Sequence, residues 1–342
     1  MADYLCSVTI GIPVYNAEKY IERCLISVLD QTFEDFEVLV VDDRGNDNSI
    51  AIVERMAKKH PRGKCIRLVK HDRNKGVAHA RNTILCEASG KYLFFMDSDD
   101  EISENAISLL YDKAELDNAD TVWGSYQCVA DNPQKEYIKR YPDIKLFGED
   151  KLVEYDCLNA GESLQPAIWN ILFRIDFLRS SGIKFEQHGS LDDLIFQYRI
   201  QPKIKRAVLT SDVTYYYYVR ENSISNFQTR SSFKRAEAVN AMEAAKCLKE
   251  SCSTLSSKSY YEWRCTKVMH QCLYFCYGIL RYRNKMDQPV SNREIRDIMT
   301  HPSTIWQILH FKHTLVINLL FYLLGVLPPT LMVIVVKLIS RR

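Results

Sequence analysis

The segment Asp97-Ser98-Asp99-Asp100 places several carboxylates close together directly after an apolar run, Tyr92 to Met96. That run is expected to be a buried β-strand. Carboxylates two residues apart at a strand end project to one side, and such hard oxygen ligands suit Mg²⁺ or Mn²⁺. We therefore expect Asp97 and Asp99 to hold a divalent cation, which would neutralise the charge on a departing diphosphate.

This acidic segment has two simpler interpretations. An EF-hand loop starting at Asp97 needs Gly at its sixth position and Glu at its twelfth, but the sequence has Ile102 and Ser108 there. That argues against a calcium loop. An isolated pair of aspartates is usually part of a solvated acidic loop, here one that would precede a helix near Ser103. The surrounding sequence decides between such a loop and a metal site.

The elements that would position these carboxylates alternate between two patterns. Apolar runs typical of buried parallel strands occupy 8–12, 38–41, 66–69 and 92–96, and helical patterns occupy 17–30, 48–60 and 77–88. This βαβαβαβ order predicts an α/β unit of the nucleotide-binding type. In such sheets ligands bind at the carboxyl ends of the strands, where Asp97 lies.

The rest of the chain shows a change from mixed to helical patterns. A helix at 104–116, a strand at 121–128 and a polar loop at 131–150 are followed by helical patterns from 231 to 283 and a connecting segment at 289–302. We expect the middle section to form the substrate-facing half of the same domain.

Seven segments within about the first 100 residues carry a resemblance to a known family. They are Val8 to Asn16, Gln31-Thr32-Phe33, Val40 to Asp43, Asn46 to Ser49, Asn74-Lys75-Gly76, Ala80-Arg81-Asn82 and Gly90 to Asp100. In this order they closely resemble the family 2 glycosyltransferases, inverting enzymes with the GT-A fold. The resemblance implies an α/β GT-A domain with a mixed, mostly parallel sheet, followed here by a helical C-terminal extension.

The resemblance also implies which residues bind the donor: Pro13, Tyr15, Asp43, Asn74, Arg81, Asp97 and Asp99. Pro13, Tyr15 and Asp43 would line the nucleotide base, Asp97 would lie by the ribose and diphosphate, and Asp99 would bind the metal. An aromatic ring can stack on a base, and a carboxylate can accept from a ring N–H. One departure is Arg44-Gly45, where the family usually has Gly-Ser.

Further segments resemble the acceptor half of the same family: Ala167 to Arg174, Gly182 to Glu186 and Leu191 to Phe196. The family's Glu-Asp pair supplies the catalytic base as its second member, so the resemblance gives that role to Asp193 and puts Asp192 in the place of the Glu. An inverting transfer needs a carboxylate to take the acceptor's hydroxyl proton. The simpler alternative is that both aspartates supply charge at a helix N-terminus.

The tyrosine run Tyr215 to Tyr218 and the segment Glu221 to Ser225 resemble the family's closing motif. Alternate tyrosines on a strand share a face, so two are expected to pack inward while two meet solvent or sugar. Arg220 is placed to reach the donor diphosphate, or else to pair with a neighbour such as Glu221.

Composition restricts the function classes. The 45 Lys and Arg residues nearly balance the 43 Asp and Glu residues, so no strong field exists to recruit nucleic acid. Eleven cysteines in an odd, scattered set favour reduced thiols in the cytoplasm, and no basic, apolar leader begins the sequence. Cys272 and Cys276, with His270 nearby, are interpreted as buried helix residues because no second ligand pair completes a zinc site.

The segment from Thr314 to Val336 has no charged residue but is interrupted by Pro328-Pro329. If the catalytic part is cytoplasmic, a single span would place Lys337 and the two terminal arginines outside the cell, against the positive-inside bias. We expect two short helices at a membrane interface, with a packed core helix as the alternative.

Together these observations predict a glycosyltransferase with a catalytic domain over 1–228, its nucleotide half about 1–100 and its acceptor half about 101–228. A helical extension would cover 229–342, with a membrane-associating tail at about 312–342. The reaction expected is inverting transfer of a hexosyl or N-acetylhexosaminyl group from a nucleotide sugar, with UDP as the expected nucleotide, to a glycan or lipid-linked acceptor. It would use Mg²⁺ or Mn²⁺ at the inner face of the cell membrane, in cell-surface polysaccharide synthesis.

Two rival functions differ from this prediction at specific residues. A haloacid dehalogenase phosphatase has its aspartate pair after the first strand and Thr or Val after the second Asp, whereas here three strands precede and Asp100 follows. The other rival is an inactive sugar-nucleotide-binding or scaffolding protein, against which the intact Asp97, Asp99 and Asp193 argue.

Overall fold

The computed structural model describes residues 4–130, 132–159, 163–219 and 234–340. The chain divides into two compact units: Met1–Leu152, Pro166–Gln187 and Ile200–Arg220 form the first, and Val153–Gln165, His188–Arg199 and Glu221–Arg342 form the second. The domain border predicted between 228 and 229 lies outside the described residues. Two segments expected in the catalytic domain, 153–165 and 188–199, belong to the second unit.

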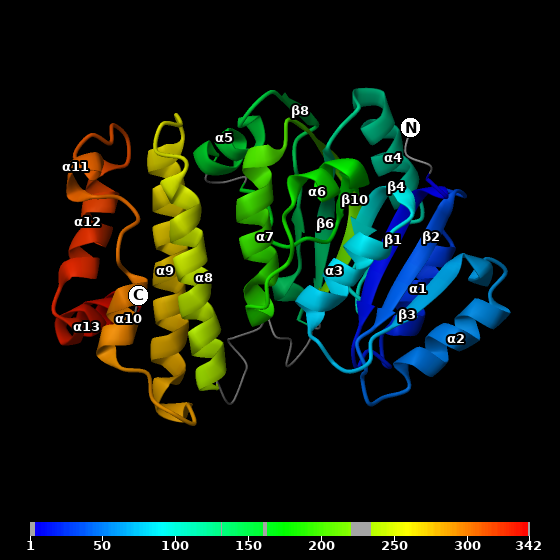
Figure 1. Ribbon diagram of the computed structural model, residues 1–342, viewed down its shortest axis with the longest axis horizontal. Coiled ribbons are helices and arrows are strands. Elements are labelled where there is room, and N and C mark those ends of the chain that lie inside the picture. The colour runs from blue at the N-terminus through cyan, green and yellow to red at the C-terminus, as the bar shows by residue number, and fades with distance from the viewer. Residues whose placement is uncertain (1–3, 131, 160–162, 220–233, 341–342) are drawn as a thin grey trace. The chain divides into compact units, whose positions relative to one another are not determined.

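The nucleotide half of the first unit has the predicted alternation of strands and helices (Figure 1). Its elements are β1 (Cys6–Val14), α1 (Ile21–Leu29), β2 (Phe36–Asp42), α2 (Ser49–Lys59), β3 (Ile66–Lys70), α3 (Val77–Glu87) and β4 (Gly90–Phe95). The four strands are parallel in the order β3-β2-β1-β4. Val14 pairs with Asp42 and Asp42 with Lys70, so the carboxyl ends of three strands meet at one edge of the sheet.

The same sheet continues through strands that are far apart in sequence, in the order β4-β9-β6-β10-β5. These strands are β5 (Glu101–Ile102), β6 (Thr121–Ala130), β9 (Ile171–Arg174) and the long β10 (Arg206–Val219). β10 runs parallel to β6, whereas β9 is antiparallel to both its neighbours, so the sheet is mixed as expected. The polar loop predicted at 131–150 contains two further strands, β7 (Tyr137–Lys139) and β8 (Ile144–Phe147), which pair with β6 and β10.

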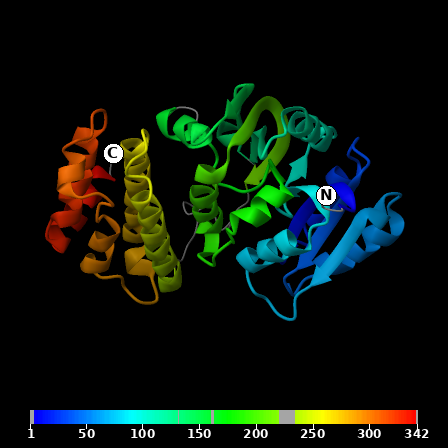
Figure 2. The ribbon, with the colours of Figure 1, turned by 45° about the horizontal axis from the view of Figure 1, so that its top comes forward.

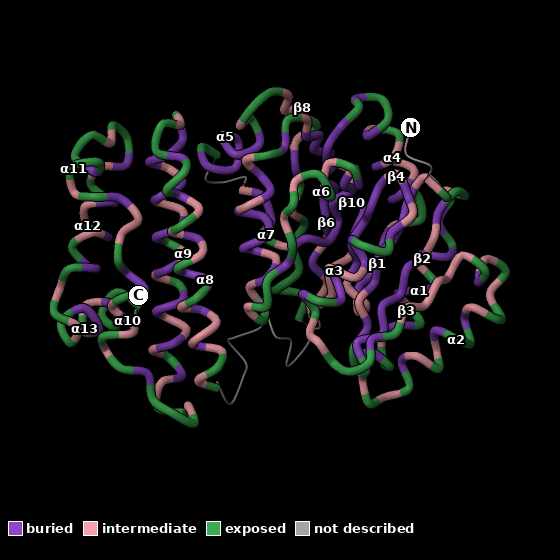
Figure 3. The backbone as a smooth tube through the Cα atoms, in the orientation of Figure 1, coloured by how far each residue is buried: buried purple, intermediate pink, exposed green. Residues whose placement is uncertain are grey.

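Helices cover both faces of this sheet, and the strands between them are buried (Figure 3). On one face, apolar side chains of α1, α2 and α4 (Ala106–Asp117) form a core with Val8, Ile10 and Ile12 of β1. On the other face α3 approaches so closely that a Cβ at Gly11 would lie 2.3 Å from Ile84, which explains the glycine in β1. This tight packing holds the strand ends in place.

The second unit is made of helices, seen in both ribbon views (Figures 1 and 2). They are α5 (Lys151–Leu158), α7 (Asp192–Ile200), α8 (Arg235–Ser253), α9 (Tyr261–Tyr282), α10 (Asn292–Ile298), α11 (Ile305–Ile308), α12 (Leu315–Val326) and α13 (Pro329–Ile339). α6 (Ile175–Ser181) belongs to the first unit. Cys272 and Cys276 are buried in α9 within the apolar core, as the sequence predicted. The segment 289–302, expected to be only a connection, contains α10.

The C-terminal tail divides at Pro328 into the two short helices that were expected. One side of these helices packs into the core of the second unit through Phe321, Leu324, Met332, Val333 and Val336. The fully buried Asn318 of α12 donates to Thr266 Oγ1 of α9 at 2.7 Å and lies 3.0 Å from His301 Nε2. Within the parts of the chain that the structure describes, no helix is both long and apolar enough to span a bilayer.

Candidate functional site

The turn after β4 brings three carboxylates together. Ligand oxygens of Asp97, Asp99 and Asp100 all lie within 4.8 Å of one another. The sequence predicted the first two of these, and the turn adds Asp100. Three converging carboxylates match the hard oxygen ligands that Mg²⁺ and Mn²⁺ take, so the residues present fit a divalent cation.

Asp100 and Tyr215 tie this turn to strand β10. Both side chains are fully buried, and the Tyr215 hydroxyl donates to Asp100 Oδ2 at 2.7 Å while Tyr218 N donates to Oδ1 at 2.9 Å. The backbone N–H of Asp97 donates to the same tyrosine oxygen at 3.3 Å. Burial raises the pKa of Asp100 well above its usual range, and the negative charge of the neighbouring Asp97 raises it further. A bound cation would oppose this effect by favouring the carboxylate.

An arginine from each of two helices, α1 and α3, contacts the same turn. Arg81 of α3 lies 3.1 Å from Asp97 Oδ1, and its own side chain is almost completely buried. Arg23 of α1 donates to the backbone carbonyl of Asp99 at 2.8 Å, and its guanidinium stacks 3.7 Å from the centre of the Tyr218 ring. Arg81 was assigned from the sequence, whereas Arg23 was not, because it lies inside a helix with no local signal.

Asp43 lies just past the end of β2 and is only 2% exposed. Its Oδ1 accepts from Lys75 N at 2.8 Å and lies 2.7 Å from His71 Nδ1, while its Oδ2 accepts from Gly76 N at 2.8 Å. The carboxylate therefore shapes the loop that begins α3. His71 was missed in the sequence, although its place directly after β3 made it one of the residues to inspect.

The other residues assigned to the base lie along the same edge. Pro13 is half-buried near the end of β1, whereas Tyr15 is 50% exposed and Asn74 is exposed. A hydrogen bond joins the turn after β1 to the turn after β2, because Asn16 Oδ1 accepts from Asn46 N at 2.7 Å. An exposed aromatic ring beside these fixed turns offers a face on which a base can stack.

Arg44-Gly45 stands where the family usually has Gly-Ser, and this difference has a structural consequence. Arg44 has φ +59°, in the left-handed region that glycine adopts without strain. Its side chain donates to the His71 carbonyl at 2.5 Å, and its backbone N–H donates to Asp42 Oδ1 at 2.7 Å. The next position must be glycine here, because a Cβ at Gly45 would lie 2.7 Å from the backbone of Asn16.

Alternate residues of the tyrosine run do pack on one side. Trp169 stacks on Tyr215 with ring centres 4.6 Å apart and on Tyr217 at 5.4 Å, and it meets Tyr126 edge-on at 4.9 Å. The neighbouring Asn170 is buried with φ +60° and donates to the carbonyls of Gly124 and Ser125. This aromatic cluster supports the strand that carries Tyr215. Arg220 and Glu221 to Ser225 lie outside the described residues.

Asp192 and Asp193 begin helix α7 in the second unit. Asp192 is 2% exposed, and its Oδ1 accepts from His188 N at 2.6 Å. Asp193 is less buried. The helix N-terminal position considered as the simpler alternative is thus present for both residues, and the buried Asp192 has a local structural role.

Comparison with known sequences points in one direction. The profile described as "Glycosyl transferase family 2" matches residues 9–160. A poly(ribitol-phosphate) beta-glucosyltransferase of Bacillus spizizenii is 29% identical over 221 residues, which cover 63% of this chain and 32% of that protein. Glycosyltransferase GlyG of Streptococcus pneumoniae is 26% identical over 237 residues, covering 67% of this chain and 76% of the relative. The chain thus matches only about a third of the first of these relatives.

Solved structures share the fold. S. aureus TarS 1–349, in complex with UDP-GlcNAc, superposes with a TM-score of 0.54 at 19% identity, covering 93% of this chain and 90% of that one. The mannosyltransferase PcManGT of Pyrobaculum calidifontis, in complex with GDP-Man and Mn²⁺, has a TM-score of 0.54 at 17% identity, covering 98% and 85%. At these identities the likeness concerns the fold, and it confirms the expected GT-A architecture.

Proposed function

We propose that this chain transfers a sugar from a nucleotide-activated donor to an acceptor, with inversion at the anomeric carbon. The premise is its match to glycosyl transferase family 2 through residues 9–160. The observation that carries the proposal is the convergence of Asp97, Asp99 and Asp100 at the carboxyl end of β4, their oxygens within 4.8 Å of one another. Parallel sheets place ligands at this edge.

The donor would bind along this edge through its nucleoside diphosphate. Asp99 and Asp97 would hold Mg²⁺ or Mn²⁺, which supplies Lewis-acid neutralisation of the leaving diphosphate. Arg81, 3.1 Å from Asp97 Oδ1, keeps that carboxylate oriented. Pro13, Tyr15, Asp43 and Asn74 would contact the base and ribose. We propose a UDP-sugar carrying a hexosyl or N-acetylhexosaminyl group, supported by the UDP-GlcNAc that TarS binds.

Asp193 is proposed as the base that takes the acceptor's hydroxyl proton. Of the two adjacent aspartates, Asp192 is buried and accepts from the His188 backbone at 2.6 Å, which suits an anchoring role. Asp193 is the more exposed member of the pair, so it can reach a substrate at lower cost. A general base must lie within hydrogen-bond reach of its substrate.

The acceptor is proposed to be a glycan or lipid-linked molecule of cell-surface polysaccharide synthesis. The names of relatives support this class, among them the poly(ribitol-phosphate) beta-glucosyltransferase and a teichoic acid poly(glycerol phosphate) polymerase of Staphylococcus epidermidis. We further propose that the enzyme works at the cytoplasmic membrane surface and that tail residues 312–342 contact it. Apolar side chains that the packed faces of α12 and α13 leave exposed support this contact.

The proposal is tested by incubating the full chain with a panel of nucleotide sugars and measuring release of the nucleoside diphosphate with Mn²⁺ and with a chelator. Metal-dependent release from one donor is expected, and Asp99→Asn should abolish it. A matched control is Asp143→Asn, an exposed aspartate elsewhere in the first unit. If donors bind but are never turned over, with or without acceptor extracts, the protein is the inactive binding or scaffolding protein instead.

A further inference from the structure

One face of helix α1 contacts the backbone of the segment that carries the three aspartates. Arg23 Nη2 donates to the Asp99 carbonyl at 2.8 Å, and Ser27 Oγ accepts from Ile102 N at 3.3 Å. Arg23 and Ser27 are four residues apart, so they lie on the same side of the helix. The conformation of the turn after β4 therefore depends on α1 as well as on the strand itself.

Arg23 joins three separate segments through one guanidinium group. Besides the Asp99 carbonyl, which follows β4, it contacts Glu101 of β5 and Tyr218 of β10. Its Nε lies 2.7 Å from Glu101 Oε1 in an ion pair without hydrogen-bond geometry, and its Cζ lies 3.7 Å from the centre of the Tyr218 ring. A planar group with donors at its edge and a flat face can make all three contacts at once, whereas a lysine ammonium cannot.

The partners of this guanidinium are also fixed to one another. Tyr218 N donates to Asp100 Oδ1 at 2.9 Å, and Glu101 pairs with Tyr216 where β5 meets β10. Burial, together with a hydrogen bond to Glu101, raises the pKa of Tyr218 to about 12, so its hydroxyl stays protonated at neutral pH. The guanidinium therefore rests on side chains that are themselves held in place.

A direct contact with the donor is the alternative role for Arg23, because its side chain is 42% exposed beside the aspartates. Two observations favour positioning instead. Its Nη2 already donates to the Asp99 carbonyl, and the Glu101 carboxylate, 2.7 Å from Nε, offsets the positive charge that a diphosphate would need. The guanidinium is thus better suited to hold the turn than to hold phosphate oxygens.

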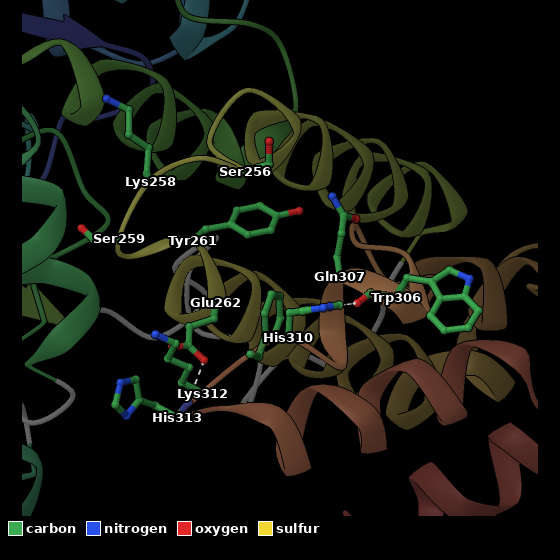
Figure 4. A pocket seen from close by; sticks show the side chains of 11 residues that line it. Ser256, Lys258, Ser259, Tyr261, Glu262, Trp306, Gln307, His310, Lys312 and His313 are labelled. Carbon is green, nitrogen blue, oxygen red and sulfur yellow. Dashed lines mark hydrogen bonds between the residues drawn. The ribbon is translucent and has the colours of Figure 1, made fainter.

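The helical unit holds a turn in the same manner with the charges reversed (Figure 4). Glu262, at the start of α9, lines a cavity of about 710 Å³, and its Oε2 accepts from the backbone N–H groups of His313 and Thr314, both at 3.0 Å. In both cases a charged side chain on a helix fixes the backbone of a neighbouring turn. The turn held by Glu262 carries no residue assigned to the reaction, whereas the turn held by Arg23 carries Asp99.

We propose that Arg23 is a positioning residue for the divalent-metal site, holding the Asp99 backbone so that the Asp99 carboxylate meets the cation together with that of Asp97. The inference rests on the proposed function, which assigns these two aspartates to the metal, and adds a residue that touches neither the metal nor the donor. Removing a group that orients a metal ligand typically weakens metal binding by about ten- to a hundredfold. We expect an effect near the lower limit, because Arg23 acts on the ligand through its backbone.

The test is a titration of the full chain with Mn²⁺, alone and with UDP, followed by the loss of the electron paramagnetic resonance signal of free Mn²⁺ on binding. Arg23→Met and Arg23→Lys should both weaken Mn²⁺ binding on the order of tenfold. Arg55→Met is the matched control, since Arg55 of α2 is 44% exposed and forms a 2.7 Å ion pair with Glu22 of α1. Mn²⁺ affinity that is unchanged in Arg23→Met, or equally lowered in Arg55→Met, would overturn the proposal.

The same titrations separate positioning from a direct phosphate contact. Positioning predicts that the fold loss in Mn²⁺ affinity is the same without UDP and with it, and that lysine at position 23 is no better than methionine. A loss that occurs only with UDP present, and that Arg23→Lys restores, would mean that the positive charge itself binds the diphosphate. That outcome would overturn the positioning role.

Substitutions at Tyr218 keep the proposal testable if the Arg23 variants fail to fold, which thermal melts would show. Tyr218→Leu removes the ring on which the guanidinium packs and should weaken Mn²⁺ binding on the order of threefold, whereas Tyr218→Phe keeps the ring and should bind normally. Equal Mn²⁺ affinity in these two variants would contradict the proposal.

Failure of the inference is distinguishable from failure of the proposed function. If the unaltered chain binds no Mn²⁺, with or without UDP, the proposed metal site is wrong and the inference falls with it. If the unaltered chain binds Mn²⁺ and the variants at Arg23 and Tyr218 bind it equally well, the metal site stands and only the positioning role is rejected.

Discussion

His71 Nδ1 lies 2.7 Å from Asp43 Oδ1, and His71 Nε2 lies 2.9 Å from Thr83 Oγ1. The imidazole therefore connects the end of β2 to helix α3 beneath the proposed base site. Since the same Asp43 carboxylate accepts from the backbone of Lys75 and Gly76, His71 helps to fix the carboxylate and, through it, the loop.

The first prediction is that His71→Ala weakens donor binding on the order of tenfold and lowers the free energy of unfolding by about 1–3 kcal/mol, because a buried carboxylate loses a partner. Calorimetry with UDP and Mn²⁺, together with denaturant unfolding, measures both. Thr83→Val serves as a control, since it removes only the outer hydrogen bond. Unchanged UDP affinity in His71→Ala would remove Asp43 and its loop from the donor site.

Asp193→Asn is predicted to keep donor binding and to lose at least about a hundredfold in turnover, because an amide keeps the shape but cannot accept the proton. Asp192→Asn should instead mainly lower stability, since its buried carboxylate accepts from His188 N. Turnover assays and thermal melts on both variants separate the roles. Near-normal turnover in Asp193→Asn would move the base to another residue.

Position 44 allows a matched pair of substitutions. Both Arg44→Gly and Arg44→Ala remove the side chain that contacts the His71 carbonyl, but only alanine retains the strain of φ +59°. We predict that the glycine variant is more stable than the alanine variant by about 1 kcal/mol. Denaturant unfolding measures the difference, and an alanine variant as stable as the glycine variant would contradict the left-handed conformation.

Glu37 should make stability depend on pH. Burial alone would raise its pKa, but hydrogen bonds from Arg67, Thr9 and Ser89 outweigh burial and hold the pKa below its usual range. A carboxyl group whose pKa is depressed in the folded state stabilises that state. Its contribution is complete above the pKa of the unfolded state and is lost as the pH falls through the pKa of the folded state. We therefore predict that Glu37→Gln costs about 1–2 kcal/mol at pH 7.

The cost of Glu37→Gln should shrink as the pH is lowered below about 4, the usual range of a glutamate. Unfolding curves at several pH values test this, with Glu22→Gln, on an exposed helix surface, as the control. A cost that does not change with pH would mean that the charge of Glu37 contributes nothing.

The tail offers a second matched pair. Leu324→Ala should cost about 2–4 kcal/mol, since Leu324 is buried in the core of the second unit, whereas Leu320→Ala should cost less than about 0.5 kcal/mol, since Leu320 is 52% exposed. Denaturant unfolding compares them. Because the packed stripe belongs to that core, removal of residues 312–342 is expected to destabilise the unit. A full-length chain and a truncated chain with equal stability would contradict this packing.

The elements of the nucleotide half were predictable because their signals are local. A buried parallel strand is apolar on both faces, and each predicted strand overlaps an observed one, as 38–41 overlaps β2. The strands β7 and β8 were missed, since each is only three or four residues long and forms by pairing with β6 or β10. Such pairing depends on partners distant in sequence.

The tail shows the same division. Its interruption at Pro328 was evident from the sequence, because proline lacks the N–H that a continuous helix needs. Which stripe of α12 is buried was not, because the apolar residues extend nearly all round the helix. Asn318 settles it, through Thr266 of α9 and His301, which lie 52 and 17 residues away in the chain.

The sequence by itself indicated the family resemblance, the alternation of strands and helices in the nucleotide half, and the aspartates Asp97 and Asp99, because ordered motifs and strand-end positions are properties of the local chain. Only the tertiary structure added Asp100, held by Tyr215 from 115 residues away, and the bond between His71 and Asp43. These pairs are decided by packing, because a buried polar group must find a partner wherever the fold brings one within reach.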